Sequence, residues 1–210
     1  LPLQDGFDNA GLQIGLTEVE ATGALLCLDV TEAVLDEAIA LGHNLVISHH
    51  PLIFKGYKSI TGKDYVERCI LKAIKNDIVI YSAHTNLDNA YGGVNYKIAE
   101  KIGLKNLQVL EPKENSLQDD LMQAGAGIVG ELDEPETELE FLKRIKKTFE
   151  VGCVRHNRLT GREIQKVALC GGAGAFLLPQ AIRAGADVFI TGEIKYHDYF
   201  GHEGDILMAE

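Results

Sequence analysis

The sequence predicts an α/β fold with two similar lobes, each containing a strand-helix-strand unit in a mixed, mostly parallel sheet flanked by helices. Three observations predict this fold: apolar runs that alternate with helical patterns, an ungapped internal repeat, and polar motifs directly after the apolar runs. A chain of 210 residues with 46% hydrophobic side chains can bury the core that such lobes need. Alternating strands and helices favour parallel pairing, which brings the carboxyl ends of the strands to one edge of each sheet.

The internal repeat aligns Leu26–Ser48 with Leu169–Thr191 at a constant offset of 143 residues, the difference between 26 and 169. Each copy predicts a strand, a helix that ends in a glycine, and a second strand. A chance similarity of two generic units is the alternative, and the ungapped register favours duplication. The predicted strands are Ala24–Leu28 and Leu45–Ser48 in the first copy, and Val167–Cys170 and Val188–Thr191 in the second.

The remaining elements follow from periodicity and place the boundary between the lobes. Apolar residues recur at helical spacing in two segments, and a polar stretch without periodicity indicates a linker. We therefore expect an N-terminal lobe at residues 1–110 and a C-terminal lobe at residues 111–210, truncated at its C-terminal end. The predicted elements are a helix at Tyr65–Lys75, a strand at Ile78–Tyr81, a linker at Glu111–Asp120, a turn at Asp133–Glu136, a helix at Glu138–Phe149 and a strand at Ile206–Ala209.

Composition restricts the class of protein. The net charge of -11 and the pI near 5.1 argue against a nucleic-acid partner, which would need a basic patch. The four cysteines form no Cys-x-x-Cys pair, as expected of core residues in a reducing compartment. No apolar stretch approaches the roughly 18 residues that cross a bilayer, and the sequence shows no charged-then-apolar leader. We therefore expect a cytoplasmic protein with no membrane partner.

Two adjacent histidines, His49 and His50, follow the predicted strand at Leu45–Ser48 and precede Pro51. Successive side chains of an extended strand point to opposite faces, so both rings reach one site only where the strand ends. Pro51 supplies that break, because a proline cannot donate to a sheet ladder. The pair indicates metal ligands at a sheet edge, and polar residues on an ordinary surface loop are the alternative.

A second pattern, His84-x-x-x-Asp88, follows the predicted strand at Ile78–Tyr81. Imidazole and carboxylate together suit zinc, manganese or iron, and an aspartate can bridge two ions about 3.5–4 Å apart. The alternative is a turn or cap residue. Because neighbouring parallel strands end at the same edge, this pattern and the histidine pair together favour a metal site.

Three further features leave alternatives open. The loop Asp8–Gly15 contains two glycines that its backbone geometry requires, and no chemical role follows for its polar residues. The segment Gly171–Gly174 lies between a strand and a helix, where it is either a phosphate-binding loop or a tight turn. Glu193 occupies the repeat position of the histidine pair, and with His197 it is a candidate for the wall of a metal cleft.

Four motifs occur in one order and context: Asp8-Asn9-x-Gly11-Leu12-x-x-Gly15, His49-His50-Pro51-Leu52, His84-Thr85-Asn86-Leu87-Asp88 and Thr191-Gly192-Glu193. Together they resemble the Nif-three-like dinuclear-metal family, whose members are often named GTP cyclohydrolase 1 type 2 homologues. The resemblance covers essentially the whole chain and implies a two-lobed α/β fold, two divalent metal ions per subunit and a homohexameric ring. It also implies that His49, His50 and Asp88 are metal ligands, with Asp88 as the bridge.

The sequence departs from the family at two places. The family completes its metal site with a histidine and a glutamate in a His-x-x-x-Glu pattern after the last strand, and this sequence ends at Glu210, before such a pattern. We therefore expect the metal to be weakly held or missing in this chain. Some longer relatives carry an inserted module between the lobes, and the junction at Leu117–Asp120 is short here.

The leading functional hypothesis is a metal-dependent hydrolase that activates water on zinc, manganese or iron near neutral pH. The resemblance suggests a nucleotide such as GTP, or a pterin-like small molecule, as the substrate. His84 is the catalytic candidate, as a proton carrier or as a group that orients a ligand, since an imidazole titrates near physiological pH. The alternative is a non-catalytic metal-binding scaffold or regulatory ring that engages other proteins.

Overall fold

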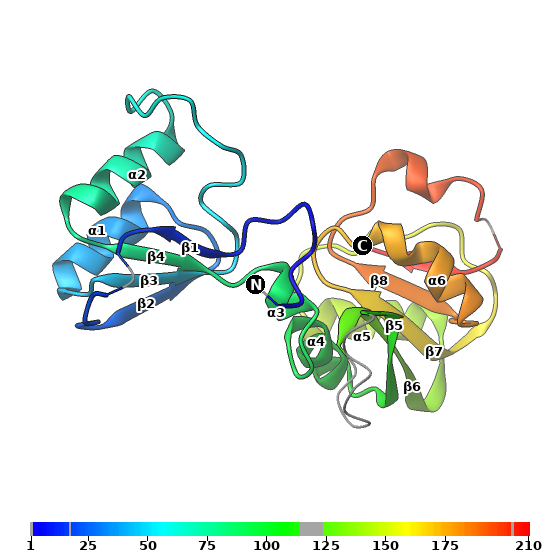
Figure 1. Ribbon diagram of the computed structural model, residues 1–210. Helices are drawn as coiled ribbons and strands as arrows, with labels where there is room; N and C mark the ends of the chain where they lie inside the picture. Colours follow the sequence, from blue (N-terminus) through cyan, green and yellow to red (C-terminus); the bar gives the residue numbers. More distant parts are fainter. Residues whose placement is uncertain (1, 17, 114–123, 203) are drawn as a thin grey trace. The chain divides into compact units, whose positions relative to one another are not determined.

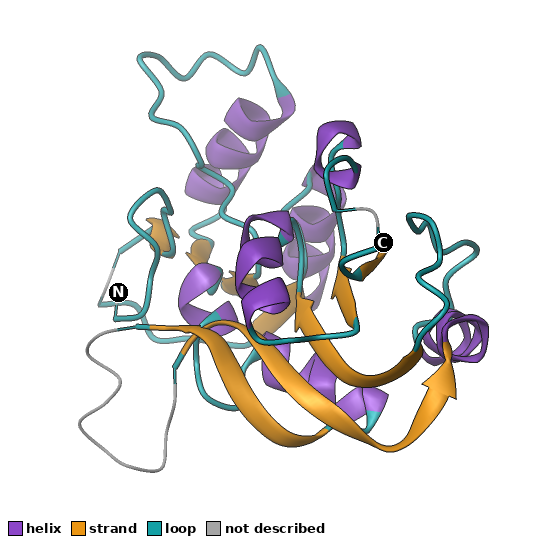
Figure 2. Ribbon diagram, turned by 90° about the vertical axis from the view of Figure 1, so that its right-hand side faces the viewer, coloured by secondary structure: helices purple, strands orange, loops and turns teal. Residues whose placement is uncertain are grey.

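Two mixed sheets organise the computed structural model, one in each of the two units into which the chain divides, Leu1–Leu87 and Asp88–Glu210. The structure describes residues 2–16, 18–113, 124–202 and 204–210. Helices flank both sheets, as Figures 1 and 2 show, so the predicted α/β class is confirmed. None of the helices in the described part of the chain has the length and apolar character that crossing a membrane requires.

The first unit has a four-stranded sheet in the order β1-β4-β3-β2. Strands β2, β3 and β4 are parallel, and β1 runs antiparallel to β4. The short helix α3 (Thr85–Asp88) spans the division between the units. The other elements of this unit are β1 (Gly11–Ile14), β2 (Ala24–Cys27), α1 (Glu32–Leu41), β3 (Leu45–Ser48), α2 (Tyr65–Lys75) and β4 (Val79–Ser82).

Helices α1 and α2 cover one face of this sheet. Each begins after a residue whose side chain accepts a hydrogen bond from a backbone N–H of the first turn: Thr31 caps α1 and Asp64 caps α2. Burial alternates along β3 and β4, because the side chains of a strand have a period of two. The fully buried Leu35 of α1 therefore packs in one cluster with Val46 of β3 and Ile80 of β4.

The second unit has a five-stranded sheet in the order β5-β6-β7-β8-β9, in which β7, β8 and β9 are parallel. Its long strands curve visibly in Figure 2. Two apolar clusters cover its two faces, one with α4 and α5 and the other with α6. The elements are α4 (Val94–Ile102), β5 (Lys105–Pro112), β6 (Gly125–Thr137), α5 (Glu138–Thr148), β7 (Glu163–Cys170), the 3-10 turn η2 (Ala175–Leu177), α6 (Leu178–Arg183), β8 (Val188–Thr191), the 3-10 turn η3 (Tyr196–Tyr199) and β9 (Leu207–Ala209).

The internal repeat recurs in the strand pairing. In the first unit Ala24 of β2 pairs with Leu45 of β3, and in the second unit Val167 of β7 pairs with Val188 of β8 at the same offset. Both helices are followed by a glycine with a nearly equal left-handed backbone: φ is 68° at Gly42, the C-cap of α1, and 69° at Gly185, one residue beyond the C-cap Ala184 of α6. The copies differ in the helix itself, because the second begins with the 3-10 turn η2. The repeat is therefore structural as well as sequential.

Three expectations about the middle of the chain differ from the structure. Glu111–Pro112 ends strand β5 rather than opening a linker, and Leu117–Asp120 lies outside the described residues. The turn predicted at Asp133–Glu136 is wrong, because this segment lies within β6, where the pairing with β7 shifts between Glu131 and Glu136. At that shift β6 has extra residues relative to β7, and these are the residues whose composition resembles a turn. The division after Leu87 also precedes the boundary expected at residue 110, because α4 and β5 pack with β6.

Candidate metal centre

Three histidines meet at the carboxyl ends of β3 and β4. His49 and His50 follow Ser48, and His84 follows Ser82 by two residues, while Ser48 and Ser82 are paired across the two parallel strands. The ring centroids lie 5.0 Å apart for His49 and His50, 5.2 Å for His49 and His84, and 5.6 Å for His50 and His84. One ligand nitrogen of each ring lies within 4.8 Å of the other two. The ends of adjacent strands thus bring the rings to one point.

Each ring is oriented by a hydrogen bond from Nδ1 to an oxygen of the first unit. Carboxylate and carbonyl oxygens only accept, so Nδ1 carries the hydrogen and the neutral ring keeps its lone pair on Nε2. Metal-binding imidazoles in proteins are held in this manner. The bonds run from His49 to the Ala83 carbonyl (2.9 Å), from His50 to Asp29 Oδ1 (2.8 Å) and from His84 to Asp8 Oδ1 (2.7 Å).

Asp8 is the buried anchor of this arrangement. Its Oδ2 accepts from the Thr85 backbone N–H at 3.1 Å and from the Thr85 hydroxyl at 2.5 Å, and Oδ1 accepts from the Asn9 N–H at 2.7 Å besides His84. Burial raises the pKa of Asp8, but the hydrogen bonds from His84, Thr85 and Asn9 outweigh it and hold the pKa below its usual value. Asp8 is therefore a carboxylate that fixes the His84 ring.

Two buried serines support the strand ends beneath the rings. The hydroxyls of Ser48 and Ser82 lie 2.8 Å apart, and the Ser48 hydroxyl donates to the His50 carbonyl at 2.8 Å. Both serines are almost fully excluded from solvent. The backbone that carries the histidines is thus tied to the sheet and is not an ordinary surface loop.

The donor set fits a divalent cation. Three imidazoles with oriented lone pairs are ligands that zinc and its neighbours accept, and three protein ligands leave room for water or substrate. His49 and His84 are half-buried and His50 is exposed, so an ion can reach them. Among the described residues, this is the one group of three or more ligand side chains close enough to hold an ion.

The predicted ligands are only partly brought together. His49 and His50 lie in the group, and so does His84, which the sequence suggested as a catalytic or orienting residue. Asp88 ends α3 in the second unit and is not in the group, so its role as a bridging ligand stays a prediction.

The sequence did not assign a role to two acceptors, Asp8 and Asp29. Asp8 lies in the motif that runs to Gly15, and the structure accounts for the glycines: Gly11 and Gly15 have φ 110° and 103°, and a Cβ on Gly15 would lie 2.9 Å from Val79 Cγ2. Asp29 follows the end of β2 by two residues, as His50 follows the end of β3, so its position after a strand was the available signal.

The counterpart of the histidine pair in the second unit has different chemistry. The Gly172 carbonyl accepts from the N–H groups of Gly192 and Glu193 and from the Thr191 hydroxyl. The Thr191 hydroxyl also accepts from the Gly174 N–H at 2.8 Å, so polar groups of this loop are engaged in hydrogen bonds within the loop and to the end of β8. These bonds favour the tight turn over the phosphate-binding loop. Glu193 and His197 are exposed, and their place at a cleft stays a prediction.

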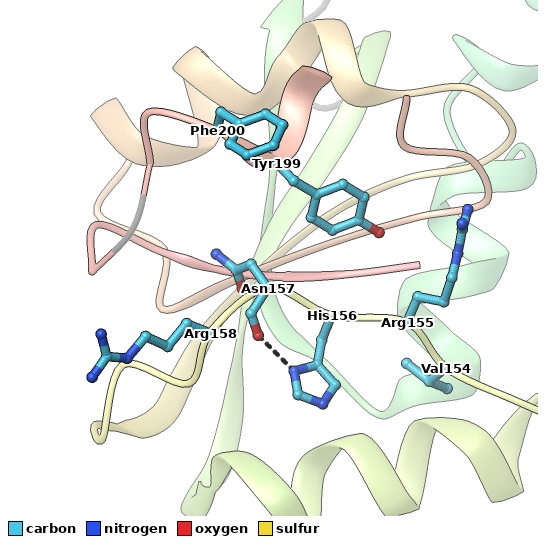
Figure 3. A pocket seen from close by; sticks show the side chains of 7 residues that line it. All are labelled: Val154, Arg155, His156, Asn157, Arg158, Tyr199 and Phe200. Carbon is cyan, nitrogen blue, oxygen red and sulfur yellow. Dashed lines mark hydrogen bonds between the residues drawn. The ribbon is translucent and has the colours of Figure 1, made fainter. Parts of the chain in front are cut away.

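The second unit also has a cavity of about 590 Å³ beside residues 154–158 (Figure 3). The Tyr199 hydroxyl donates to Glu210 at 2.9 Å, and Arg155 pairs with the same carboxylate. Burial and this hydrogen bond raise the pKa of Tyr199 to about 12. In Figure 3 the side chains of Arg155, His156 and Arg158 point in different directions, so they form no common ligand set.

The chain is similar to known proteins over nearly its whole length. The family model Duf34/NIF3 (NGG1p interacting factor 3) matches residues 1–208. A Clostridium perfringens protein named GTP cyclohydrolase 1 type 2 homolog is 39% identical over 93% of this chain and 72% of its own length. A Lactococcus lactis protein of the same name is 37% identical over 96% of this chain and 74% of its own length.

Two solved structures have the same fold. A Staphylococcus aureus hypothetical protein superposes with a TM-score of 0.87 at 34% identity, covering 98% of this chain and 79% of its own. A Bacillus cereus protein related to NIF3 superposes with a TM-score of 0.88 at 28% identity, covering 99% and 82%. The two-unit α/β architecture is therefore shared with these proteins.

Proposed function

The chain belongs to the Duf34/NIF3 family, and on that premise we propose that it is a divalent-metal-dependent hydrolase acting on a nucleotide or a pterin-like small molecule. The curated relatives that carry the name GTP cyclohydrolase 1 type 2 homolog support the substrate class. The observation that carries the proposal is the group of three imidazoles, each oriented through Nδ1 by an oxygen acceptor.

His49, His50 and His84 would hold an ion, and Asp88 would complete a site for two ions. A bound divalent ion lowers the pKa of water toward neutrality and supplies a nucleophile for hydrolysis. The residues of the chain prepare the site before any ion binds: Asp8 fixes the His84 ring, and the buried Thr85 fixes Asp8. Such preorganisation raises affinity because the ligands lose little conformational freedom on binding.

The experiment that tests this function compares His50→Ala and His84→Ala with the native protein. Zn²⁺ and Mn²⁺ are titrated by calorimetry, and turnover is measured on a panel of nucleotides and pterins. Each substitution removes one oriented ligand, so we expect weaker ion binding and loss of turnover. His43→Ala is the matched control, because His43 is half-buried in the same unit and lies outside the group.

Two outcomes separate the alternatives. Turnover by ion-free protein, or unchanged ion binding in both variants, would overturn the proposal. Ion binding that depends on His50 and His84, combined with no turnover on the whole panel, would favour the non-catalytic metal-binding scaffold instead.

A further inference from the structure

The loop between β3 and α2, residues Pro51–Lys63, begins directly after the histidine pair. Figure 1 shows it as the long cyan segment that leads to α2. We call it the β3–α2 loop. It contains neither helix nor strand, and every residue from Phe54 to Thr61 is exposed. Loops beside a site on a rigid sheet frequently bind the ligand of that site.

Hydrogen bonds fix both ends of the β3–α2 loop to the first unit. Near its start, the Ile53 carbonyl accepts from Asn9 Nδ2 at 2.6 Å. At its end, Glu67 Oε2 accepts from the N–H groups of Thr61 and Lys63 at 2.8 and 3.1 Å. The exposed middle of the loop is therefore held at two points although no other segment covers it.

Phe54 presents an aromatic ring at the candidate metal centre. Its ring centroid lies 6.2 Å from that of His84, with 76° between the ring planes, and the residue is 49% exposed. Asn9, which holds Ile53, is adjacent in sequence to Asp8, which holds His84, so one short segment positions both rings. An aromatic ring that is half exposed adds little to the core, but its face can stack against a flat heterocycle.

The β3–α2 loop is the basic part of an acidic unit. The first unit has eleven acidic residues and six lysines and arginines, and three of these six, Lys55, Lys58 and Lys63, lie in the loop, which has no acidic residue. Arg68 and Lys72 of α2 pair with acidic side chains of α1. Within the described part of the chain, no ion pair involves Lys55 or Lys58. Two ammonium groups are therefore available to an anion, and lysine binds phosphate as a point charge.

We propose, resting on the function proposed above, that the β3–α2 loop binds the substrate and that this substrate is a phosphorylated heterocycle, such as a nucleotide, rather than an unphosphorylated pterin. Phe54 stacks against the ring system and holds it beside the three imidazoles. Lys55 and Lys58, one and four residues further along the chain, bind the phosphate. Four residues span at most about 14 Å, so one short segment supplies both contacts.

Calorimetric titration of the Zn²⁺-saturated protein with guanosine monophosphate and with guanosine tests this role. We expect the monophosphate to bind at least about tenfold more tightly, with a difference that shrinks as salt is added. Replacing Lys55 and Lys58 together by alanine should remove this difference and leave guanosine binding unchanged. Phe54→Leu should weaken binding of both probes at least about fivefold, and Phe54→Tyr, which keeps the ring, should not. Lys75→Ala is the matched control, because Lys75 is exposed at the end of α2 that leads to the amino end of β4.

Circular dichroism and Zn²⁺ titration of each variant should match the native protein, since the substituted side chains are exposed and are not in the imidazole group. Equal affinity for the two probes, or binding that neither the lysine nor the Phe54→Leu substitution changes, would overturn the proposal. Normal turnover and ion binding combined with that result would refute the role of the loop alone. Loop-dependent binding of the monophosphate without turnover on the nucleotide and pterin panel would instead refute the proposed hydrolysis and still support the loop as the binding element.

Discussion

The two units share one strand-helix-strand arrangement but carry different polar residues at the ends of its strands. The strands β2 and β3 of the first unit and β7 and β8 of the second pair in the same register, and both copies bury a leucine at the same repeat position, Leu35 and Leu178. Where the first unit continues from β3 into two histidines, the second continues from β8 into Gly192 and Glu193. The two units therefore share the pairing of their strands and differ in the residues that follow these strands.

This difference shows where the chemistry of the fold resides. The imidazoles of the first unit are oriented by acceptors from other segments, among them Asp8 and Asp29. At the matching edge of the second unit, the Gly172 carbonyl is occupied by donors from the residues after β8. The apolar core specifies the strand-helix-strand arrangement, and the residues beyond the strands specify what each unit can bind.

The largest effect is expected from deleting the core leucine of each copy. Leu35→Ala and Leu178→Ala each leave a cavity in a well-packed cluster, and each should lower the free energy of unfolding by about 2–5 kcal/mol. Urea unfolding measures the loss, and amide hydrogen exchange assigns it to one unit. Leu139→Ala, at an exposed position of α5, should have little effect. If one core substitution proved neutral, the two copies would not share the same core role.

The next largest effect is expected at the candidate metal centre of the first unit. Asp8→Asn keeps the shape of the side chain but weakens its hold on His84 and places an amide against the Thr85 donors. Loss of such an orienting acceptor lowers metal affinity by about 10–100-fold. Calorimetric titration with Zn²⁺ measures the change, and Asp36→Asn, in an exposed pair with Lys72, is the control. Unchanged affinity would show that Asp8 serves the fold alone.

Sequence patterns predicted the parts of the fold that depend on local periodicity. The helix expected at Tyr65–Lys75 has those bounds, because its apolar stripe and its cap are both local signals. The repeat predicted the pairing of β7 with β8 because equal registers leave equal patterns of apolar residues. The turn at Asp133–Glu136 failed because a register shift within a strand places turn-forming residues inside a sheet.

The candidate site was predictable only in part. His49 and His50 are visible because they follow a strand directly, and the structure adds His84 through the pairing of β3 with β4. Asp8 reaches His84 across 76 residues, and Asp29 reaches His50 across 21. Contacts that join a loop to a distant strand end leave no periodic signal, so their partners appear only in three dimensions.

A third test concerns the buried glutamates that anchor a loop to a helix in each unit. Glu67 of α2 accepts from the Thr61 N–H and hydroxyl and from the Lys63 N–H, and Glu138 of α5 accepts from the Thr160 N–H and hydroxyl and from the Gly161 N–H. The hydrogen bond from the Thr61 N–H, with the others, overcomes the effect of burial and lowers the pKa of Glu67 to about 2.

The pH dependence follows from that lowered value. Because the folded pKa lies below the value of 4.5 for an unperturbed glutamate, the stability it provides is present above pH 4.5 and is lost as the pH falls toward about 2. Urea unfolding across this range should show a steeper loss for the native protein than for Glu67→Gln. Parallel losses in the two proteins would show that the carboxylate does not provide this stability.

The smallest expected effect gives the most direct comparison of the two units, because the substituted residues occupy equivalent positions in both. Gly42 and Gly185 occupy equivalent positions just after the helices of the two copies, at φ 68° and 69°, and an added Cβ would meet no atom within 4 Å at either. Gly42→Ala and Gly185→Ala should therefore each lower the free energy of unfolding by about 1 kcal/mol, through the left-handed backbone alone. Gly152→Ala is the control, because Gly152 has equal space without a left-handed backbone and should tolerate alanine. Unequal losses at Gly42 and Gly185 would show that the helix ends, although alike in geometry, stabilise their units differently.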